Sequence, residues 1–275
     1  MSEYSFLIDS MEWSFSRINS FCQCKYEWYL QYIESAVGQN NFYAEFGKFC
    51  HAILEKYAKG ELSLFELADY FDAHYDEEVP SMVYHKTADI RQNYRDKAVE
   101  YFENIDLVFL PNAESTRAVP DLEKYEILGI EKKCNFTVGG KPFVGYIDLL
   151  LRDKNTGGII VLDHKSSEYP LGKRGQVLKS EEKKFKSYKR QLYLYAIQVY
   201  NEYGVYPEKI GWNYFKNRKW LFLDFDKEDY DEAQNWALST IAEINEEENF
   251  NPNVDFYYCH NLCRYRNSYC EYKNY

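Results

Sequence analysis

This 275-residue sequence lacks several features that define common protein classes. It contains no run of about 18 apolar residues, so no membrane-spanning helix is expected. Its start, Met1-Ser2-Glu3-Tyr4, has no basic segment followed by an apolar one, which argues against a signal peptide. No repeat, low-complexity tract or Pro/Gly-rich linker divides the chain. We therefore expect a cytoplasmic protein with a single elaborated domain over residues 1–275.

The cysteine count is odd, at seven, and disulfides are not expected in a reducing compartment. A cluster of cysteines is then better interpreted as a metal or iron–sulfur site. The net charge of −11 argues, taken alone, against a polyanionic partner. The 28 tyrosines and 18 phenylalanines suit base stacking, but an aromatic core is the favoured interpretation.

Hydrophobic periodicity predicts helices in the first part of the chain. Apolar residues recur at helical spacing over residues 14–36 and again over 42–59. Residues 62–118 show acidic helical faces and are punctuated by two prolines. We therefore expect a helical insertion at 62–118.

From Tyr125 the apolar period changes to two, which predicts strands. Gly139-Gly140 separates the first two segments and predicts a tight hairpin turn. The predicted order is an antiparallel meander of strands 126–138, 141–151 and 158–166, a helix at 188–202, strands at 209–215 and 219–225, and a helix at 228–248. The tail, residues 251–275, has little periodicity, so its order must come from something other than packing.

Two aspartates lie in the predicted meander, where aspartate is uncommon. Asp148 is set in an apolar run, and Asp163 follows Val161-Leu162 on the next strand. A hairpin can bring both carboxylates together as oxygen ligands for Mg²⁺ or Mn²⁺. Lys165 shares the strand face of Asp163. An ion pair of either aspartate with Lys165 is the structural alternative.

Four further residues are spaced to join this site. His51 lies on the predicted helix 42–59, with Glu55 one turn later to orient it or to bind a second ion. A lone helical histidine is more often structural, but the surrounding pattern favours a ligand. Gln191 and Tyr195 share one face of the predicted helix 188–202. Together these groups suit metal-dependent phosphodiester hydrolysis, which needs an activated water and neutralised charge at phosphorus.

The segments resemble the RecB-type branch of the PD-(D/E)XK nuclease superfamily, over roughly residues 13–271. The motifs are Gly-x3-His-x2-Leu-Glu at His51, Gly-x-Ile-Asp at Asp148, Asp-x-Lys at Asp163 and Lys165, and Gln-x3-Tyr at Gln191 and Tyr195. The resemblance implies a restriction-endonuclease-like α/β core, with a central mixed sheet flanked by helices. It also implies that His51, Asp148 and Asp163 bind Mg²⁺ or Mn²⁺, that Lys165 acts at the phosphate, and that the Gln-x3-Tyr helix borders the site and contacts DNA.

The same branch includes members with a [4Fe–4S] cluster, held by one cysteine near the N-terminus and three near the C-terminus. The opening Ser-x-Ser-Arg motif aligns Cys24, rather than Cys22, with the first ligand, although Lys25 replaces the usual proline. The C-terminal ligands would be Cys259, Cys263 and Cys270, with each gap one residue longer than in the commoner form. Zinc remains the alternative occupant, since four thiolates suit both. Either would staple the tail to the N-terminal helix.

Basic residues are concentrated between Leu171 and Arg190. Eight stand there against Glu181 and Glu182: Lys173, Arg174, Lys179, Lys183, Lys184, Lys186, Lys189 and Arg190. A solvated loop would explain such a run, but we favour contact with the DNA backbone, because the run lies between Lys165 and Gln191. The predicted DNA contacts are Lys173, Arg174, Lys186, Lys189 and Arg190, together with Arg17 of the opening motif.

The resemblance implies a DNA exonuclease of phage DNA metabolism, recombination or repair, acting on single strands or free ends. One alternative is a nuclease that trims DNA before CRISPR adaptation. Another is a silent, nuclease-fold DNA-binding subunit, which would usually have lost the Asp-x-Lys pair or His51. No Gly-x4-Gly-Lys-Ser/Thr motif is present, so any unwinding must come from a helicase or recombination partner.

Overall fold

The computed structural model describes residues 3–83, 86–105 and 124–272. Its centre is a five-stranded sheet in the order β1-β2-β3-β4-β5. β3 and β4 are parallel and the other neighbours are antiparallel, so the sheet is mixed. The predicted α/β class and meander are confirmed, and every strand bound lies within two residues of its prediction. The strands are β1 (Tyr125–Val138), β2 (Lys141–Asp153), β3 (Ile159–Lys165), β4 (Lys209–Tyr214) and β5 (Lys219–Asp224).

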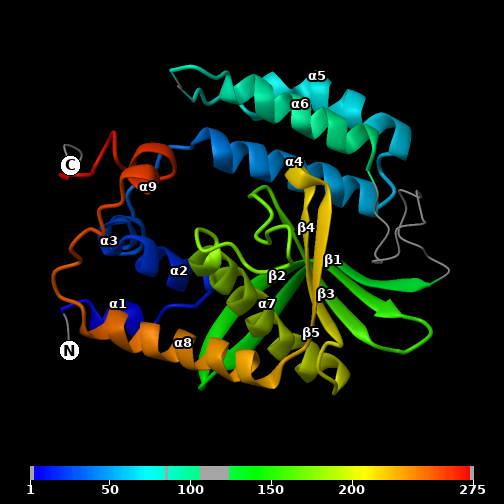
Figure 1. The fold of residues 1–275 in the computed structure, drawn as a ribbon. Coiled ribbons are helices and arrows are strands. Elements are labelled where there is room, and N and C mark those ends of the chain that lie inside the picture. Colours follow the sequence, from blue (N-terminus) through cyan, green and yellow to red (C-terminus); the bar gives the residue numbers. More distant parts are fainter. Residues whose placement is uncertain (1–2, 84–85, 106–123, 273–275) are drawn as a thin grey trace.

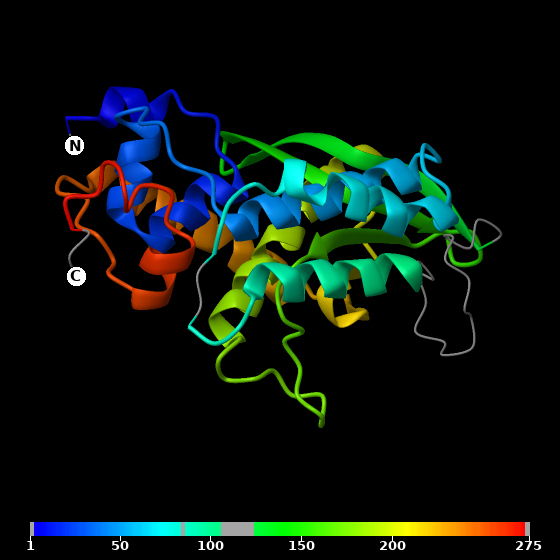
Figure 2. The same ribbon diagram turned by 90° about the horizontal axis from the view of Figure 1, so that it is seen from above.

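Helices cover both faces of the sheet (Figures 1 and 2). The helices on one side are α4 (Phe42–Ala58), α5 (Leu67–Glu78) and α6 (Ile90–Glu103), and those on the other are α7 (Glu182–Tyr203) and α8 (Lys227–Glu246). Each side has its own buried core, because consecutive side chains of β3 point to opposite faces. Leu162 packs with α4 and α5, whereas Val161 packs with α7 and α8.

The predicted helix 14–36 is two helices, α2 (Phe15–Gln23) and α3 (Lys25–Tyr32). Cys24 separates them with an extended backbone, φ −154° and ψ 113°. The break lets Phe21 and Trp28 meet edge to face at 5.8 Å in one core. Sequence periodicity missed the break because both helices bury aromatic side chains on the same side.

Two other predicted segments differ from their predictions. One helix begins earlier than predicted, and part of the predicted helical insertion lies outside the described residues. The helix predicted at 188–202 begins at Glu182, where Phe185 is buried among lysines that obscure the apolar pattern. Within the predicted insertion 62–118, the described part forms a single-turn helix (Leu64–Glu66), α5 and α6. The rest of that prediction, from 106 onward, lies outside the described residues.

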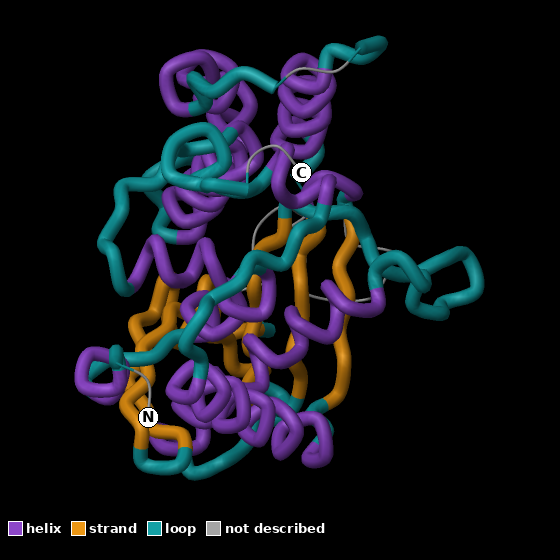
Figure 3. The backbone as a smooth tube through the Cα atoms, turned by 90° about the vertical axis from the view of Figure 1, so that its left-hand side faces the viewer, coloured by secondary structure: helices purple, strands orange, loops and turns teal. Residues whose placement is uncertain are grey.

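The C-terminal tail contains one short helix, α9 (Phe256–Asn261), which lies near α3 (Figure 1). In Figure 3 this side of the molecule, with the C-terminal end, faces the viewer. Glu27 of α3 accepts a hydrogen bond from the Tyr258 hydroxyl at 2.6 Å. The Gln39 N–H donates to the Arg264 carbonyl at 2.8 Å, and Tyr265 is buried. Polar contacts and aromatic packing, by Tyr265 and by Tyr272 against Tyr26, therefore hold the tail. Among the described residues, no helix has the length and apolar character needed to cross a membrane.

The start of the chain is placed beside the meander. After α1 (Ser5–Asp9), Trp13 forms two backbone hydrogen bonds of 2.8 Å with β2, to the Pro142 carbonyl and from the Val144 N–H. The next residue, Ser14, caps α2 by accepting a hydrogen bond from the Arg17 N–H at 3.1 Å. The N-terminus of α2 consequently borders the same cavity as Asp148 and Asp163 of the meander.

Candidate active site

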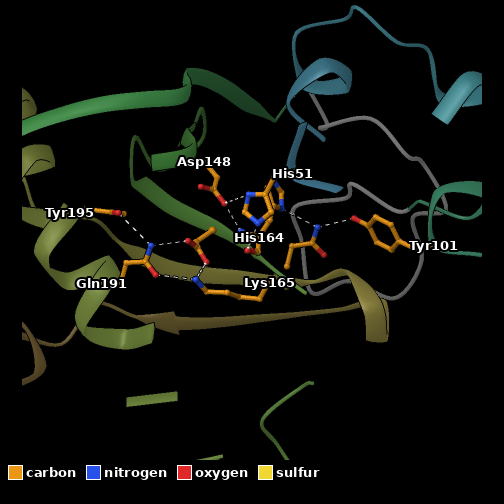
Figure 4. A network of polar contacts seen from close by, with 9 residues as sticks. His51, Tyr101, Asp148, His164, Lys165, Gln191 and Tyr195 are labelled. Atoms are coloured by element: carbon orange, nitrogen blue, oxygen red, sulfur yellow. Dashed lines mark hydrogen bonds and ion pairs between the residues drawn. The ribbon is translucent and has the colours of Figure 1, made fainter. Parts of the chain in front are cut away.

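One cavity of about 550 Å³ gathers the residues that the sequence singled out. It lies where α2, α4 and α7 meet β2 and β3, and Figure 4 shows the polar network inside it. The predicted site residues in its lining are His51, Asp148, Asp163, Lys165, Gln191 and Tyr195. All six predicted catalytic and metal-binding side chains therefore meet, although they come from four separated segments.

Strand register brings the two aspartates together. Leu149 pairs with Leu162, so Asp148 and Asp163 stand one step further along β2 and β3. The backbone N–H of His164 donates a hydrogen bond of 2.7 Å to Asp148 Oδ2. The side chain of Asp163 is buried, with 3% of its surface exposed. The acids therefore form a fixed pair at the floor of the cavity.

Lys165 and Gln191 hold Asp163. Lys165 Nζ lies 2.6 Å from Asp163 Oδ2 and donates to Gln191 Oε1 at 2.9 Å. Gln191 Nε2 in turn donates to Asp163 Oδ1 at 3.2 Å. Burial alone would lower the pKa of Lys165, but the adjacent Asp163 carboxylate outweighs it and raises that pKa. Burial raises the pKa of the Asp163 carboxyl, and the adjacent Lys165 opposes that rise. The ion pair considered as a structural alternative is present within the cavity.

Gly145 of β2 leaves room for the ring of Tyr195, the last side chain of this polar network. A Cβ atom at Gly145 would lie 2.3 Å from Cε1 of Tyr195, so only glycine lets this ring pack against β2. The Tyr195 hydroxyl accepts a hydrogen bond of 3.4 Å from Gln191 Nε2. Burial raises the pKa of Tyr195 to about 12. Tyr195 is thus a neutral neighbour of the acids rather than a proton donor at neutral pH.

His51 is oriented by the backbone of β3. Its Nε2 lies 2.8 Å from the His164 carbonyl, and because a carbonyl only accepts hydrogen bonds, Nε2 carries the proton. The lone pair of neutral His51 is then on Nδ1, which lies 3.4 Å from Asp148 Oδ2. Nδ1 is therefore the nitrogen available to a cation.

Buried polar side chains on the side of the sheet that faces α6 form a chain of hydrogen bonds to His164, the residue between Asp163 and Lys165. Asn213 of β4 donates to His164 Nδ1 at 3.1 Å and to the Tyr101 hydroxyl of α6 at 2.8 Å (Figure 4). Burial, reinforced by the nearby His51, lowers the pKa of His164 to about 3, so its ring is neutral. The helix pair α5–α6 is thereby linked to the residue between Asp163 and Lys165.

The structure adds a carboxylate that the sequence reasoning missed. One ligand atom from each of His51, Glu131 and Asp148 lies within 4.8 Å of the other two. Glu55, which helical spacing placed beside His51, instead pairs with Lys59 at 2.5 Å. No pattern in the sequence identified Glu131, because its position depends on an irregularity in β1. Burial, followed by repulsion from Asp148, raises the pKa of Glu131 to about 7.

The predicted DNA contacts are spread over three places. Lys186, Lys189 and Arg190 of α7 form ion pairs with Asp229 and Glu232 of α8, outside the cavity that holds the acids. Lys173 and Arg174 are exposed in the loop before α7 and form no ion pair with the described residues. The Arg17 guanidinium lies 4.6 Å from the centre of the Tyr32 ring and donates to the Glu12 carbonyl. The free positive charge is therefore smaller than the sequence implied.

The four predicted cluster cysteines line a second, small cavity of about 20 Å³. Cys24, Cys259, Cys263 and Cys270 border it together with Pro252, Val254, Tyr258, Arg266 and Tyr272. Across the described residues, no three of the sulfur atoms lie within 4.8 Å of one another. Burial raises the pKa of Cys263 to about 12. Cys22 is not part of this lining, whereas Cys24 is.

Comparison with known proteins gives a family match. The family described as the PD-(D/E)XK nuclease superfamily matches residues 12–275. None of the curated proteins matches the chain. Among solved structures, a protein from Eubacterium rectale provisionally named an exonuclease is 11% identical, with a TM-score of 0.49 over 88% of this chain and 84% of that one. A likeness at this level adds nothing to the family match.

Proposed function

Because the chain belongs to the PD-(D/E)XK nuclease superfamily, we propose that it is a deoxyribonuclease dependent on Mg²⁺ or Mn²⁺, and an exonuclease of the RecB type. The observation that carries the proposal is the meeting of Asp148, Asp163 and Lys165 with His51 in one cavity. Members of this superfamily use divalent metals, and the donor set of carboxylates and one imidazole fits such an ion.

The proposed roles follow from the contacts of each side chain. His51, Asp148 and Asp163 would hold the cation, which supplies an activated water and offsets charge at phosphorus. Lys165 stabilises the charge that develops on the phosphate and orients the attacking water. Gln191 fixes the positions of Asp163 and Lys165, which it contacts at 3.2 and 2.9 Å. Tyr195 positions Gln191 in turn.

The path of the DNA is proposed from a larger hollow beside the catalytic cavity. This hollow, of about 810 Å³, shares Phe15, Ser16 and Tyr188 with the catalytic cavity and extends toward Tyr257 of the tail. Aromatic rings can stack on bases, and the exposed Lys183 on its rim can meet a phosphate. Because Asp163 lies at the cavity floor, a single strand or a free end reaches it more easily than an intact duplex.

We propose that Cys24, Cys259, Cys263 and Cys270 hold a [4Fe–4S] cluster with a structural role. Four thiols that line one cavity are the donor set that such a cluster requires. A single zinc ion held by the same four thiolates is the alternative occupant. Either group would join the tail to the junction of α2 and α3.

The biological setting is also a proposal, namely phage DNA metabolism, recombination or repair in the cytoplasm. Trimming of DNA before CRISPR adaptation uses the same chemistry and is the second candidate. The silent DNA-binding subunit is disfavoured, because Asp163, Lys165 and Gln191 keep a complete set of mutual contacts. A helicase partner remains an expectation.

The experiment is digestion of DNA by the full-length, anaerobically purified protein. End-labelled linear single strands, linear duplexes and circular single strands are incubated with Mg²⁺, Mn²⁺ or EDTA. We expect short products from linear single strands, no cleavage of circles and no cleavage in EDTA. Asp163→Asn protein is the control for contaminating nucleases. Cleavage of circles would replace the exonuclease by an endonuclease, and absence of cleavage under all conditions would reject the catalytic proposal.

A further inference from the structure

Resting on the metal-dependent hydrolysis proposed above, we propose that Glu131 is a further ligand of the divalent cation held by His51 and Asp148. These three side chains each place a donor atom within 4.8 Å of the other two. Asp163 is not part of that compact group, since its two oxygens face Gln191 and Lys165. Glu131 is therefore the second carboxylate, beside Asp148, in the group around His51.

The register of β1 places Glu131 at this point. Ile127 pairs with Leu151, but Gly129 pairs with Leu150, so one extra residue is accommodated at Leu128. This bulge shifts the rest of β1 by one position. Without it, the apolar Ile130 would stand opposite Asp148. With it, Ile130 pairs with Leu149 and Lys132 with Ile147, so Glu131 between them stands opposite Asp148. A one-residue shift exchanges the two faces of a strand, so the bulge determines whether a carboxylate or an alkyl chain meets the site.

The backbone of β1 is also strained at Glu131 itself, three residues after the bulge. Its φ is +45°, in the left-handed region that side chains other than glycine rarely adopt. Such conformations are unfavourable and concentrate at functional sites, where the surrounding structure holds them. The strain and the bulge together aim a glutamate at His51 and Asp148.

The charge of Glu131 and its acidic neighbour also favour binding of a cation. No described residue forms an ion pair with it, and one of its carboxylate oxygens lies within 4.8 Å of a carboxylate oxygen of Asp148. Glu55, on the adjacent turn of α4 from His51, has its own partner in Lys59. Two neighbouring carboxylates without a cation repel each other, and a divalent ion removes that repulsion.

The first test is calorimetric titration of the full-length protein with Mn²⁺ in the absence of DNA. Glu131→Gln should weaken Mn²⁺ binding at least tenfold, because an amide keeps the shape but loses the charge. Glu55→Gln is the matched control and should bind within twofold of the unsubstituted protein. Glu131→Gln with unchanged Mn²⁺ affinity would overturn the inference, as would an equal loss in Glu55→Gln.

Thermal unfolding gives a second readout. Metal-free Glu131→Gln should melt at a higher temperature than the unsubstituted protein, because repulsion from Asp148 is removed, while its gain in melting temperature with Mn²⁺ should be smaller. Glu131→Gly, which adopts φ +45° without strain, should show the same smaller gain. A full Mn²⁺-induced gain in both variants would overturn the inference.

The outcomes separate this inference from the proposed function. If Glu131→Gln loses Mn²⁺ affinity and no protein cleaves DNA, the ligand assignment stands and the nuclease proposal fails. If the unsubstituted protein cleaves DNA and Glu131→Gln binds Mn²⁺ normally, the nuclease proposal stands and the ligand assignment fails.

Discussion

The catalytic cavity and the cysteine cavity are held together in different ways. In the catalytic cavity the charged side chains contact one another, as Lys165 does with Asp163 at 2.6 Å and with Gln191 at 2.9 Å. In the cysteine cavity the side chains border a shared space, and no three of the described sulfurs are close together. In the first cavity the side chains already bond to one another around Asp163, whereas in the second the proposed cluster would supply the bonds between them. Substitutions in the first should therefore change chemistry, and those in the second should change stability.

The largest expected effect is at Asp163. Asp163→Asn should lower the single-turnover cleavage rate by at least about 10³-fold, because the amide removes a charge needed at the reacting centre. The amide retains hydrogen-bonding capacity beside Lys165 and Gln191, so cooperative unfolding should persist in circular dichroism. Lys165→Ala should show a comparable loss of rate. A rate within tenfold of the unsubstituted protein for either variant would remove that residue from the catalytic set.

The second effect should fall on stability rather than on chemistry. Cys263→Ser should reduce bound iron from about four atoms per chain to nearly none and lower the melting temperature by on the order of 10 °C, because the tail loses its link to α3. Iron content and melting are measured on anaerobically purified protein.

Cys22→Ser is the matched control and should retain both iron and melting temperature, since Cys22 does not line the cavity. One zinc per chain in the unsubstituted protein would replace the cluster. An unchanged melting temperature in Cys263→Ser, with its iron lost, would erase the contrast between the two cavities.

A smaller effect is expected at Gln191, which positions rather than reacts. Gln191→Ala should lower the single-turnover rate by about 10- to 100-fold, because Asp163 and Lys165 lose the amide that fixes both. Gln198→Ala on the same helix is the control, since Gln198 bonds to Glu202 at 3.2 Å away from the acids. Equal rates for the two variants would show that the network is not needed to hold the catalytic pair.

The smallest effect concerns the basic residues. Lys173→Ala with Arg174→Ala should reduce the salt dependence of single-strand binding by about 1.4 in the slope of log K against log salt, at about 0.7 for each phosphate contact. Lys189→Ala with Arg190→Ala should change the slope less, because both side chains are already paired with α8. Fluorescence anisotropy at several salt concentrations measures both. A larger change in the second pair would place the DNA along α7.

Sequence alone predicted most of the scaffold and most of the side chains that meet in the candidate site. Period-two segments predicted all five strands, because side chains alternate between the faces of a sheet wherever the sheet forms. The spacing of Asp163 and Lys165 survives folding for the same reason, as does that of Gln191 and Tyr195 on a helix. These spacings depend only on local secondary structure, so they can be predicted from the sequence without knowledge of the tertiary fold.

Other features were decided by tertiary structure. The break at Cys24 depends on two aromatic side chains meeting in one core, and the ion pairs of Lys189 and Arg190 depend on how α8 packs against α7. Glu131 reaches the site only because a bulge shifts β1 against β2. Register and packing join residues that are distant in the chain, so no local spacing encodes them.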